Sequence, residues 1–549
     1  MDNQKEQKLL FQEFESVSTE QWEELIKKDL KGADYSKKLI WKTLDGISVK
    51  PYYRTEDLQA LPETGAPGEF PFVRGSKVDN NDWLIRQNIE FTNSDDTASK
   101  VNLLASKGVQ SVGVTFVSSP EKEALIDFLY AIPLDNIEIN FKGLNPVILL
   151  ELLNDYCAET KISKNLLRGS LGLDPLGDFA KTGKYGNMEE AMDQVANVIK
   201  GATEFENLRV FEVDAKLFHN SGSTAVQELA YAMSVAIEYM DALTDRDLDH
   251  TEIISKLTFN FAVGSTYFFE LAKFRAARQL WSRILESYMG KAPEKISFIH
   301  AETSAWNTTV YDPYINLLRT TTEAMSSVLG GVDSLTVLQF NHSFQEATEI
   351  SERLARNQQI LLKEEAYLDK VVDPAAGSYY IENLTNSLAT EAWKIFQATE
   401  ETNGFIESFM NGLVQDAIVT VAQEKDMRIA QRRDVLLGTN QYANQGETIL
   451  ANVDEKILNH TIADPTEANT QPLIPYRGAE GFESLRMDTE KADKQPVVFL
   501  LTIGNLTMRK ARAAFASNFF GCAGYKIIDN IGFSSIGEGM KAKADIVVL

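Results

Sequence analysis

The chain has 549 residues and is 44% hydrophobic, which predicts about two to four domains with sizeable apolar cores. It carries 79 Asp and Glu against 54 Lys and Arg, and the resulting formal charge of −25 argues against nucleic acid or an anionic membrane as a partner. Its two cysteines, Cys157 and Cys522, argue against a disulfide framework and leave a thiolate metal site without ligands, so no metal site is expected.

The N-terminal segment MDNQKEQKLLFQEFESV is polar and lacks the apolar core of a secretory signal. No run of 18 apolar residues occurs anywhere in the chain, so no membrane-spanning helix is expected. The sequence therefore predicts a cytoplasmic protein.

Residues 1–70 are expected to form an N-terminal arm. Residues 18–31 predict a short helix with Ser18 as its N-cap, and the Asp45-Gly46 pair between two strand patterns predicts a hairpin with a type I′ turn. The arm has too little apolar surface to stand alone. We expect it either to pack on its own subunit or to reach across to a partner chain, and the sequence favours neither.

Residues 71–400 are expected to form one α/β domain, because strand and helix patterns alternate along them. Helix patterns such as 145–157 and 223–240 lie between the strands. Eight parallel strands, each followed by a helix, predict a (β/α)₈ TIM barrel, whose ligand site lies among the loops after the strands. An open doubly wound sheet is the alternative. The strand patterns, of which the fourth is the weakest, are WLIRQNIEF, QSVGVTFV, IEINF, LRGSLGL, LRVFEVDA, LTFNFAV, KISFIHA and SLTVLQF.

The most distinctive stretch runs from Lys256 to Leu384. After its first strand, Ser265 is the expected N-cap of a long helix, and residues 312–331 predict a second helix that closes on a glycine pair. Apolar residues recur along the first helix at spacings of three and four, which indicates one buried face. They are Tyr267, Leu271, Phe274, Ala277, Trp281, Ile284 and Tyr288.

The pattern changes after residue 400. Residues 401–496 contain helices and charged loops with prolines such as Pro465, and are expected to form a helical linker. From residue 497 to 549 a buried strand, a helix, a strand, a short helix near 535–543 and a last strand predict half of a flavodoxin-like doubly wound domain. The sheet edge left open at Leu549 implies that further residues follow.

Four motifs, GSTYFFELAKFRAARQLWSRI, HAETSAW, DPYINLLRTTTEAMSSVLGG and VVDPAAGSYYIENL, occur in an order that resembles the methylmalonyl-CoA mutase family. RRDVLLGTNQY and, weakly, PFVRG extend the likeness over most of the chain. The resemblance implies an isomerase that uses adenosylcobalamin to interconvert succinyl-CoA and (R)-methylmalonyl-CoA, with a TIM barrel and a cobalamin-binding domain of flavodoxin type.

Three departures from the catalytic members are evident. Those members carry D-x-H-x-x-G, whose histidine binds cobalt, where this chain has the turn Gly504, Asn505, Leu506 and Thr507. The five histidines are His219, His250, His300, His342 and His460, so residues 497–549 contain none. A tyrosine expected after Arg74-Gly75 and a QND-type run expected near Arg168 are also missing.

The resemblance therefore implies a small, non-catalytic subunit of a heterodimer. Adenosylcobalamin and the acyl-CoA substrate would be bound by the larger catalytic subunit, and no catalytic or cofactor-binding residue is expected here. His219, after the fifth strand, is a weak candidate for a general acid, although a structural role, in which it caps a loop or satisfies backbone carbonyls, is favoured. His300 is a second weak candidate, and Glu302 and Trp306 beside it either line a remnant cavity or, as favoured, belong to a packed barrel mouth.

The remaining polar candidates are given structural roles. His250 and His460 are expected at the surface, and His342 is ambiguous. A solvated or ion-paired helix face is favoured over a phosphate site for Arg275, Arg278 and Arg283.

Three alternatives stay open. The chain is an active acyl-CoA mutase, an acyl-CoA-binding regulatory module, or an unrelated barrel enzyme that uses His219 with an acidic neighbour such as Asp214.

Overall fold

The computed structural model describes residues 14–458, 468–539 and 543–548. Its centre is a closed barrel of eight parallel strands in the order β10-β3-β4-β5-β6-β7-β8-β9. Ser334 pairs with Leu84 on one side and with His300 on the other, which closes the ring. The barrel is therefore confirmed and the open sheet is excluded. The strands are β3 Leu84–Glu90, β4 Ser111–Thr115, β5 Glu138–Lys142, β6 Gly169–Leu173, β7 Leu208–Asp214, β8 Leu257–Val263, β9 Phe298–Thr303 and β10 Ser334–Thr336.

The fourth strand of the barrel, β6, has a weak sequence pattern because it needs glycine. Gly169 has a φ of +140°, and a Cβ atom there would lie 1.7 Å from the carbonyl oxygen of Ile139 on the neighbouring strand. Only a residue without a side chain allows this approach.

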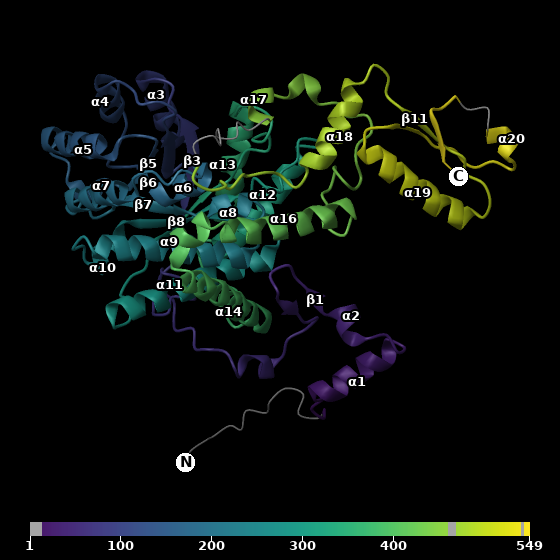
Figure 1. The fold of residues 1–549 in the computed structure, drawn as a ribbon, viewed down its shortest axis with the longest axis horizontal. Helices are drawn as coiled ribbons and strands as arrows, with labels where there is room; N and C mark the ends of the chain where they lie inside the picture. Colours follow the sequence, from purple (N-terminus) through teal and green to yellow (C-terminus); the bar gives the residue numbers. More distant parts are fainter. Residues whose placement is uncertain (1–13, 459–467, 540–542, 549) are drawn as a thin grey trace, which may run out of the picture.

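Helices surround the barrel (Figure 1). The long helix after β8 begins at Tyr267, so Thr266 and not Ser265 occupies its N-cap, and no side chain caps it. The prediction of a Ser265 cap is wrong because the turn after β8 is one residue longer than expected. The helices are α3 Ser94–Ser106, α4 Lys122–Ala131, α5 Pro146–Thr160, α6 Pro175–Thr182, α7 Met188–Gly201, α8 Lys216–Asn220, α9 Ala225–Thr244, α10 His250–Lys256, α11 Tyr267–Met289, α12 Ile315–Leu329 and α13 Glu349–Glu364.

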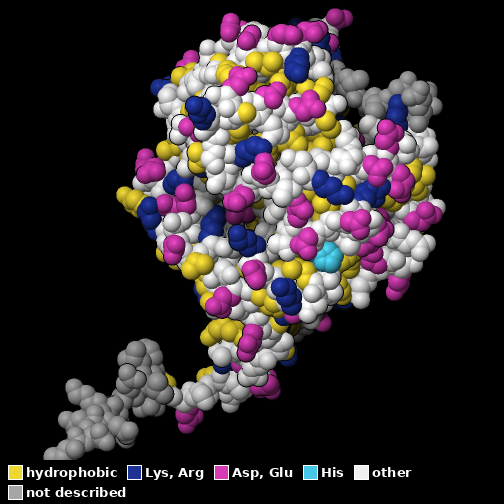
Figure 2. All heavy atoms as spheres, turned by 90° about the vertical axis from the view of Figure 1, so that its left-hand side faces the viewer, with side chains coloured by type: hydrophobic (Ala, Val, Ile, Leu, Met, Phe, Trp, Pro, Cys, Tyr) yellow, Lys and Arg dark blue, Asp and Glu magenta, His cyan; other side chains and the backbone are white. Residues whose placement is uncertain are grey.

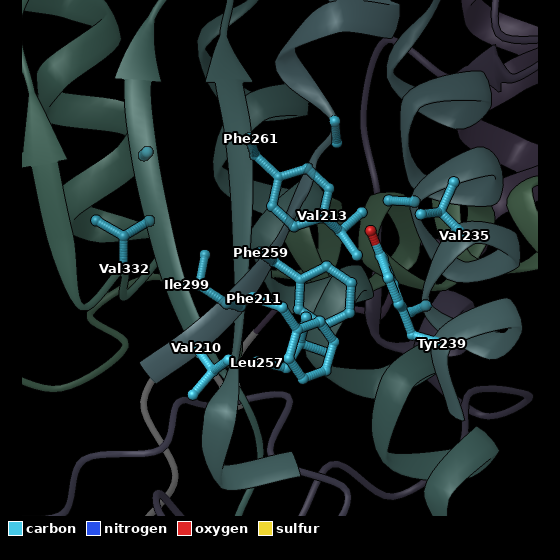
Figure 3. Packing of buried hydrophobic residues seen from close by; sticks show 14 of the residues in the cluster. Val210, Phe211, Val213, Val235, Tyr239, Leu257, Phe259, Phe261, Ile299 and Val332 are labelled. Atoms are coloured by element: carbon cyan, nitrogen blue, oxygen red, sulfur yellow. The ribbon is translucent and has the colours of Figure 1, made fainter. Parts of the chain in front are cut away.

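The main core lies between the strands and the helix layer. Figure 3 shows Phe211 and Phe259 from adjacent strands beside Tyr239 of α9, and the rings of Phe211 and Tyr239 are 5.0 Å apart. Phe259 also packs edge-on against Trp281 of α11. Each such ring, removed from water, stabilises the fold by about 1.5–3 kcal/mol. The predicted apolar face of α11 is thus confirmed as a buried face.

The arm contains α1 Thr19–Asp29, capped by Ser18 as predicted, α2 Tyr35–Leu39 and the antiparallel pair β1 Trp41–Lys42 and β2 Ser48–Val49. Thr43 pairs with Ile47 across a loop in which Gly46 alone has positive φ. The predicted type I′ turn is wrong, because a three-residue loop with a left-handed glycine at its end replaces the two-residue turn. The hairpin lies against the barrel, whereas α1, which has no buried residue, projects away from it (Figure 1).

Beyond the barrel, several helices continue the chain. Phe405, Phe409, Val414 and Ile418 belong to the main hydrophobic core, so the first part of the expected linker packs on the barrel. The elements are α14 Tyr379–Glu401, α15 Gly404–Met410, α16 Leu413–Ala430, α17 Glu455–Leu458 and α18 Glu480–Lys491. His460 and Pro465 lie outside the described residues.

The C-terminal residues form a small parallel sheet in the order β12-β11-β13, which lies to the side of the barrel (Figure 1). It comprises β11 Val497–Leu500, α19 Leu506–Cys522, β12 Lys526–Ile528, α20 Ile536–Gly539 and β13 Ile546–Val548. Residues 540–542 of the expected last helix lie outside the described part of the chain.

Acidic and basic side chains alternate over the face of the molecule in Figure 2, with hydrophobic groups between them, rather than gathering into one basic surface. Across the described ranges, none of the helices is long and apolar enough to cross a membrane.

Candidate functional site

A cavity of about 540 Å³ opens at the carboxyl-terminal mouth of the barrel. His219, Gly264 and Ser304, which follow β7, β8 and β9, line one side of it. Asp45 at the tip of the arm hairpin and Lys425 of α16 line the other. The expectation of a fully packed mouth is wrong on this side, because glycine and serine at the strand ends leave space.

His219 is buried in the wall of this cavity. Its Nε2 atom lies 2.7 Å from Oγ of Ser304, and its Nδ1 atom lies 3.7 Å from Oε2 of Glu228. Burial, together with the charge of Lys273, holds the pKa of His219 well below its usual value, so the ring is neutral. A Cβ atom at Gly264 would lie 3.1 Å from Cε1 of the ring, which shows how closely the backbone approaches it.

A buried group of three charged side chains lies next to His219 and approaches it through Glu228. Nζ of Lys273 lies 2.7 Å from Glu228 and 2.6 Å from Glu270, and all three residues are buried. Glu228 also accepts the backbone N–H of Ala262 at the end of β8. Burial raises the pKa of Glu228 to about 7, and Lys273 opposes that rise.

The sequence reasoning missed this charged group. The residues lie on α9 and α11, and only a charged residue at an otherwise apolar helix position, such as Glu228 between Val226 and Leu229, signals it. The acidic neighbour that was expected for His219 is elsewhere: Asp214 lies 3.5 Å from Lys142 and 3.8 Å from Lys216.

The barrel lumen holds a second, separate group of polar side chains. His300 is buried there, with its Nδ1 atom 2.7 Å from Oγ of Ser334. Glu302 bonds Lys216 at 3.2 Å and accepts from Asn88 at 3.1 Å. The structure thus places His300 and Glu302 away from the mouth cavity, whereas Trp306 lines it.

Ion pairs and hydrogen bonds cross the lumen from strand to strand. Lys142 lies 3.0 Å from Glu212, and Arg209 lies 3.0 Å from Glu138. At Gly113 a Cβ atom would come within 2.2 Å of Oδ1 of Asn88, so long side chains from β3 lie across the bare backbone of β4. Charged side chains therefore occupy the axis of the barrel.

The other histidines lie apart from both groups. His250 begins α10 and is half-buried, with its ring edge-on to Tyr288 at 5.8 Å. His342 is exposed after the last strand of the barrel.

The three arginines of α11 have different surroundings. Arg275 is buried and pairs with Glu382 at 2.9 Å and with Asp373 at 3.3 Å. Arg278 is buried and donates to backbone carbonyls, including that of Gly330 at 2.7 Å. Arg283 alone is exposed, with Glu286 as its partner. The expected solvated or ion-paired face is therefore confirmed as ion pairs for Arg275 and Arg283 and is wrong for Arg278, whose guanidinium donates to backbone carbonyls.

The turn between β11 and α19 does not suit a cobalt ligand. Gly504 has a φ of +94°, and the side chain of Asn505 accepts the backbone N–H groups of Thr507 and Met508 as the N-cap of α19. An amide that caps a helix is not an imidazole free to bind cobalt, and the residues at this turn do not fit cobalamin coordination. Within residues 14–458, 468–539 and 543–548, no group of three or more His, Cys, Asp or Glu side chains is arranged to hold a metal.

Comparison with known proteins adds independent information. A family model described as Methylmalonyl-CoA mutase matches residues 42–123 and 112–470. The methylmalonyl-CoA mutase small subunit of Porphyromonas gingivalis (strain ATCC BAA-308 / W83) is 43% identical over 561 residues, covering 99% of this chain and 89% of that protein. The small subunit from Streptomyces virginiae is 32% identical, covering 93% and 83%. A methylmalonyl-CoA mutase of Rhizobium meliloti (strain 1021) is 33% identical, covering 71% and 59%.

Proposed function

Because this chain belongs to the methylmalonyl-CoA mutase family, we propose that it is the small, structural subunit of a heterodimeric mutase that interconverts succinyl-CoA and (R)-methylmalonyl-CoA. The observation that carries the non-catalytic role is the occupied lumen. Arg209 and Glu138 form a buried pair in the barrel axis, and the buried Glu212 pairs there with the more exposed Lys142, so these acids would be costly to separate from their partners. An acyl chain cannot replace them there without leaving buried charges unpaired.

The family is generally cobalamin-dependent, and the partner subunit is proposed to bind adenosylcobalamin. The support for this is the helix cap at Asn505 and the lack of histidine in residues 497–549. A catalytic role for His219 in the mutase reaction is not part of the proposal, since its acceptor position is taken by Ser304.

The contribution of this chain would be a stable surface for the larger subunit, which would bind both cofactor and acyl-CoA. We divide the chain into an arm (1–70), a barrel (71–400), a helical linker (401–496) and a partial cobalamin-domain-like sheet of flavodoxin type (497–549). A cytoplasmic location is also proposed, in agreement with the two buried free cysteines.

Co-expression tests the proposal. The chain is expressed alone and together with a longer mutase-family chain that carries D-x-H-x-x-G, and the size, cobalamin content and isomerase activity of each product are measured. We expect a one-to-one complex that holds cobalamin and is active, and a lone chain that neither binds cobalamin nor turns over. Cobalamin binding with turnover by the lone chain would overturn the proposal.

A second candidate is favoured by one observation. A cavity of about 660 Å³ opens on the opposite, amino-terminal side of the barrel, where Arg168, Lys291 and Lys295 lie among acids such as Glu206 and apolar residues such as Phe298. Cations next to apolar walls suit an acyl-CoA, so the second candidate function is that of a regulatory acyl-CoA-binding module. That role predicts a rise in melting temperature when succinyl-CoA is added without the partner, and the structural role predicts none.

A further inference from the structure

A serine and a histidine line the mouth cavity side by side, and a glutamate is buried next to the histidine. Ser304 follows β9, His219 belongs to α8 after β7, and Glu228 is in the first turn of α9. Ser304 and His219 both line the 540 Å³ cavity. The consecutive helices α8 and α9 and the distant end of β9 thus bring an imidazole, a carboxylate and a hydroxyl together where barrel enzymes place their reacting groups.

The hydrogen bonds around Ser304 indicate that its hydroxyl proton points to His219. Oγ of Ser304 accepts the backbone N–H of Trp306 at 3.1 Å, which leaves the hydroxyl proton available for Nε2 of His219 at 2.7 Å. Oε2 of Glu228 lies 3.7 Å from Nδ1, which is too long for a hydrogen bond, and it pairs with Lys273 at 2.7 Å; through its charge alone Glu228 favours the tautomer with the proton on Nδ1 and a lone pair on Nε2. This is the arrangement that activates a serine nucleophile.

We propose that Ser304, His219 and Glu228 form a nucleophilic site for small acyl esters or thioesters, with Ser304 as nucleophile, His219 as base and Glu228 as a positioning residue. This inference does not depend on the mutase function proposed above. The aromatic rings of Trp41, Phe269 and Trp306 line the same cavity and offer apolar walls for a short acyl group.

The proposed hydrolysis needs no cofactor. Oγ of Ser304 bonds to the acyl carbon while its proton passes to Nε2 of His219. The carbon–sulfur or carbon–oxygen bond then breaks, and the leaving group takes that proton from His219. Water attacks the acyl-serine with His219 again as base, which releases a carboxylic acid and restores the serine.

Backbone N–H donors that could stabilise the oxyanion of the acyl intermediate lie at the cavity. Gly264, Ser265 and Thr266, which precede α11, line the cavity, and no side chain caps this helix of 23 residues. The first N–H groups of α11 are therefore available, and the positive end of the helix dipole favours a developing negative charge.

A fluorophosphonate probe and p-nitrophenyl acetate test the site on the purified full chain. We expect one phosphonylated serine, mapped by mass spectrometry to the peptide with Ser304, and hydrolysis above the buffer rate. Ser304→Ala should abolish the adduct, and Ser304→Ala and His219→Gln should each lower hydrolysis at least 10-fold. Glu228→Gln should slow labelling and move its pH profile, which a purely structural role would not do.

The matched control is Ser223→Ala, which removes another serine that lines the same cavity and should leave labelling unchanged. Mapping of the adduct on the unmodified chain decides the matter even where a variant fails to fold. The proposal is overturned by an absence of adduct at Ser304 under conditions that label a known serine hydrolase, or by equal labelling of folded His219→Gln.

Discussion

At the scale of single residues, buried acids give the fold a dependence on pH. Glu323 of α12 is 1% exposed, accepts from Nδ2 of Asn307 at 2.5 Å, and has no hydrogen-bond partner at Oε2. Burial raises the pKa of this carboxyl from 4.5 to about 8, so it is protonated in the folded protein at neutral pH.

The replacement Glu323→Gln tests this protonation. The carboxyl of Glu323 loses its proton near pH 4.5 in the unfolded chain and near pH 8 in the folded chain. The free energy of unfolding therefore falls progressively as the pH rises between these two values. We expect the variant to gain stability over the natural chain from pH 5 to pH 8, by a few kcal/mol as an order of magnitude. Urea unfolding at both pH values measures this gain.

A control replaces an exposed acid. Glu346→Gln, at an exposed position after the barrel, should leave the difference between pH 5 and pH 8 as it is in the natural chain. If Glu323→Gln behaves like this control, Glu323 is ionised in the folded protein.

At the scale of elements, α11 connects two parts of the barrel domain that lie far apart in the sequence. Arg278 donates to the carbonyls of Phe72 at 2.9 Å and Gly330 at 2.7 Å, and so joins the segment before β3 to the end of α12. Burial lowers the pKa of Arg278 to about 10, which still leaves it charged at neutral pH.

We expect Arg278→Met to lower the free energy of unfolding by about 3 kcal/mol or more, because several buried carbonyls lose their donor at once. Arg283→Met is the matched control on the same helix, since Arg283 is exposed and contacts Glu286 and the ring of Phe70. Its cost should stay below about 1 kcal/mol. Equal effects of the two substitutions in urea unfolding would show that the carbonyl contacts of Arg278 do not stabilise the fold.

The elements also show what sequence patterns can predict. All eight barrel strands could be predicted from the sequence, because the apolar run of a strand and the helix patterns on either side of it are local features. The loop of the hairpin was not, because Asp45-Gly46 suits both a two-residue turn and the end of a three-residue loop. The mouth cluster was missed for another reason: Ser304 is 85 residues from His219 in the chain and meets it only when the barrel closes, so no local sequence pattern includes both residues.

At the scale of the whole molecule, α1 is the part with the least contact to the rest. It has no buried residue and projects from the barrel (Figure 1), with Trp22 stacked on Tyr52 at 4.6 Å and Leu25 exposed. The hairpin that follows is anchored, since Asp45 accepts the backbone N–H of Val226 at the start of α9. Of the two roles expected for the arm, the hairpin therefore packs on its own subunit, and α1 remains available for a partner.

Leu25→Ser separates these roles. In the isolated chain the side chain of Leu25 is 56% exposed, so the substitution should change the free energy of unfolding by less than about 0.5 kcal/mol. In the co-expressed pair it should weaken association about 10-fold, because an apolar anchor would leave the interface. Lys28→Ser, at an exposed position of the same helix, should leave association unchanged. Sedimentation velocity over a dilution series measures the association of both variants with the partner. An unaltered affinity in Leu25→Ser would place α1 outside the interface.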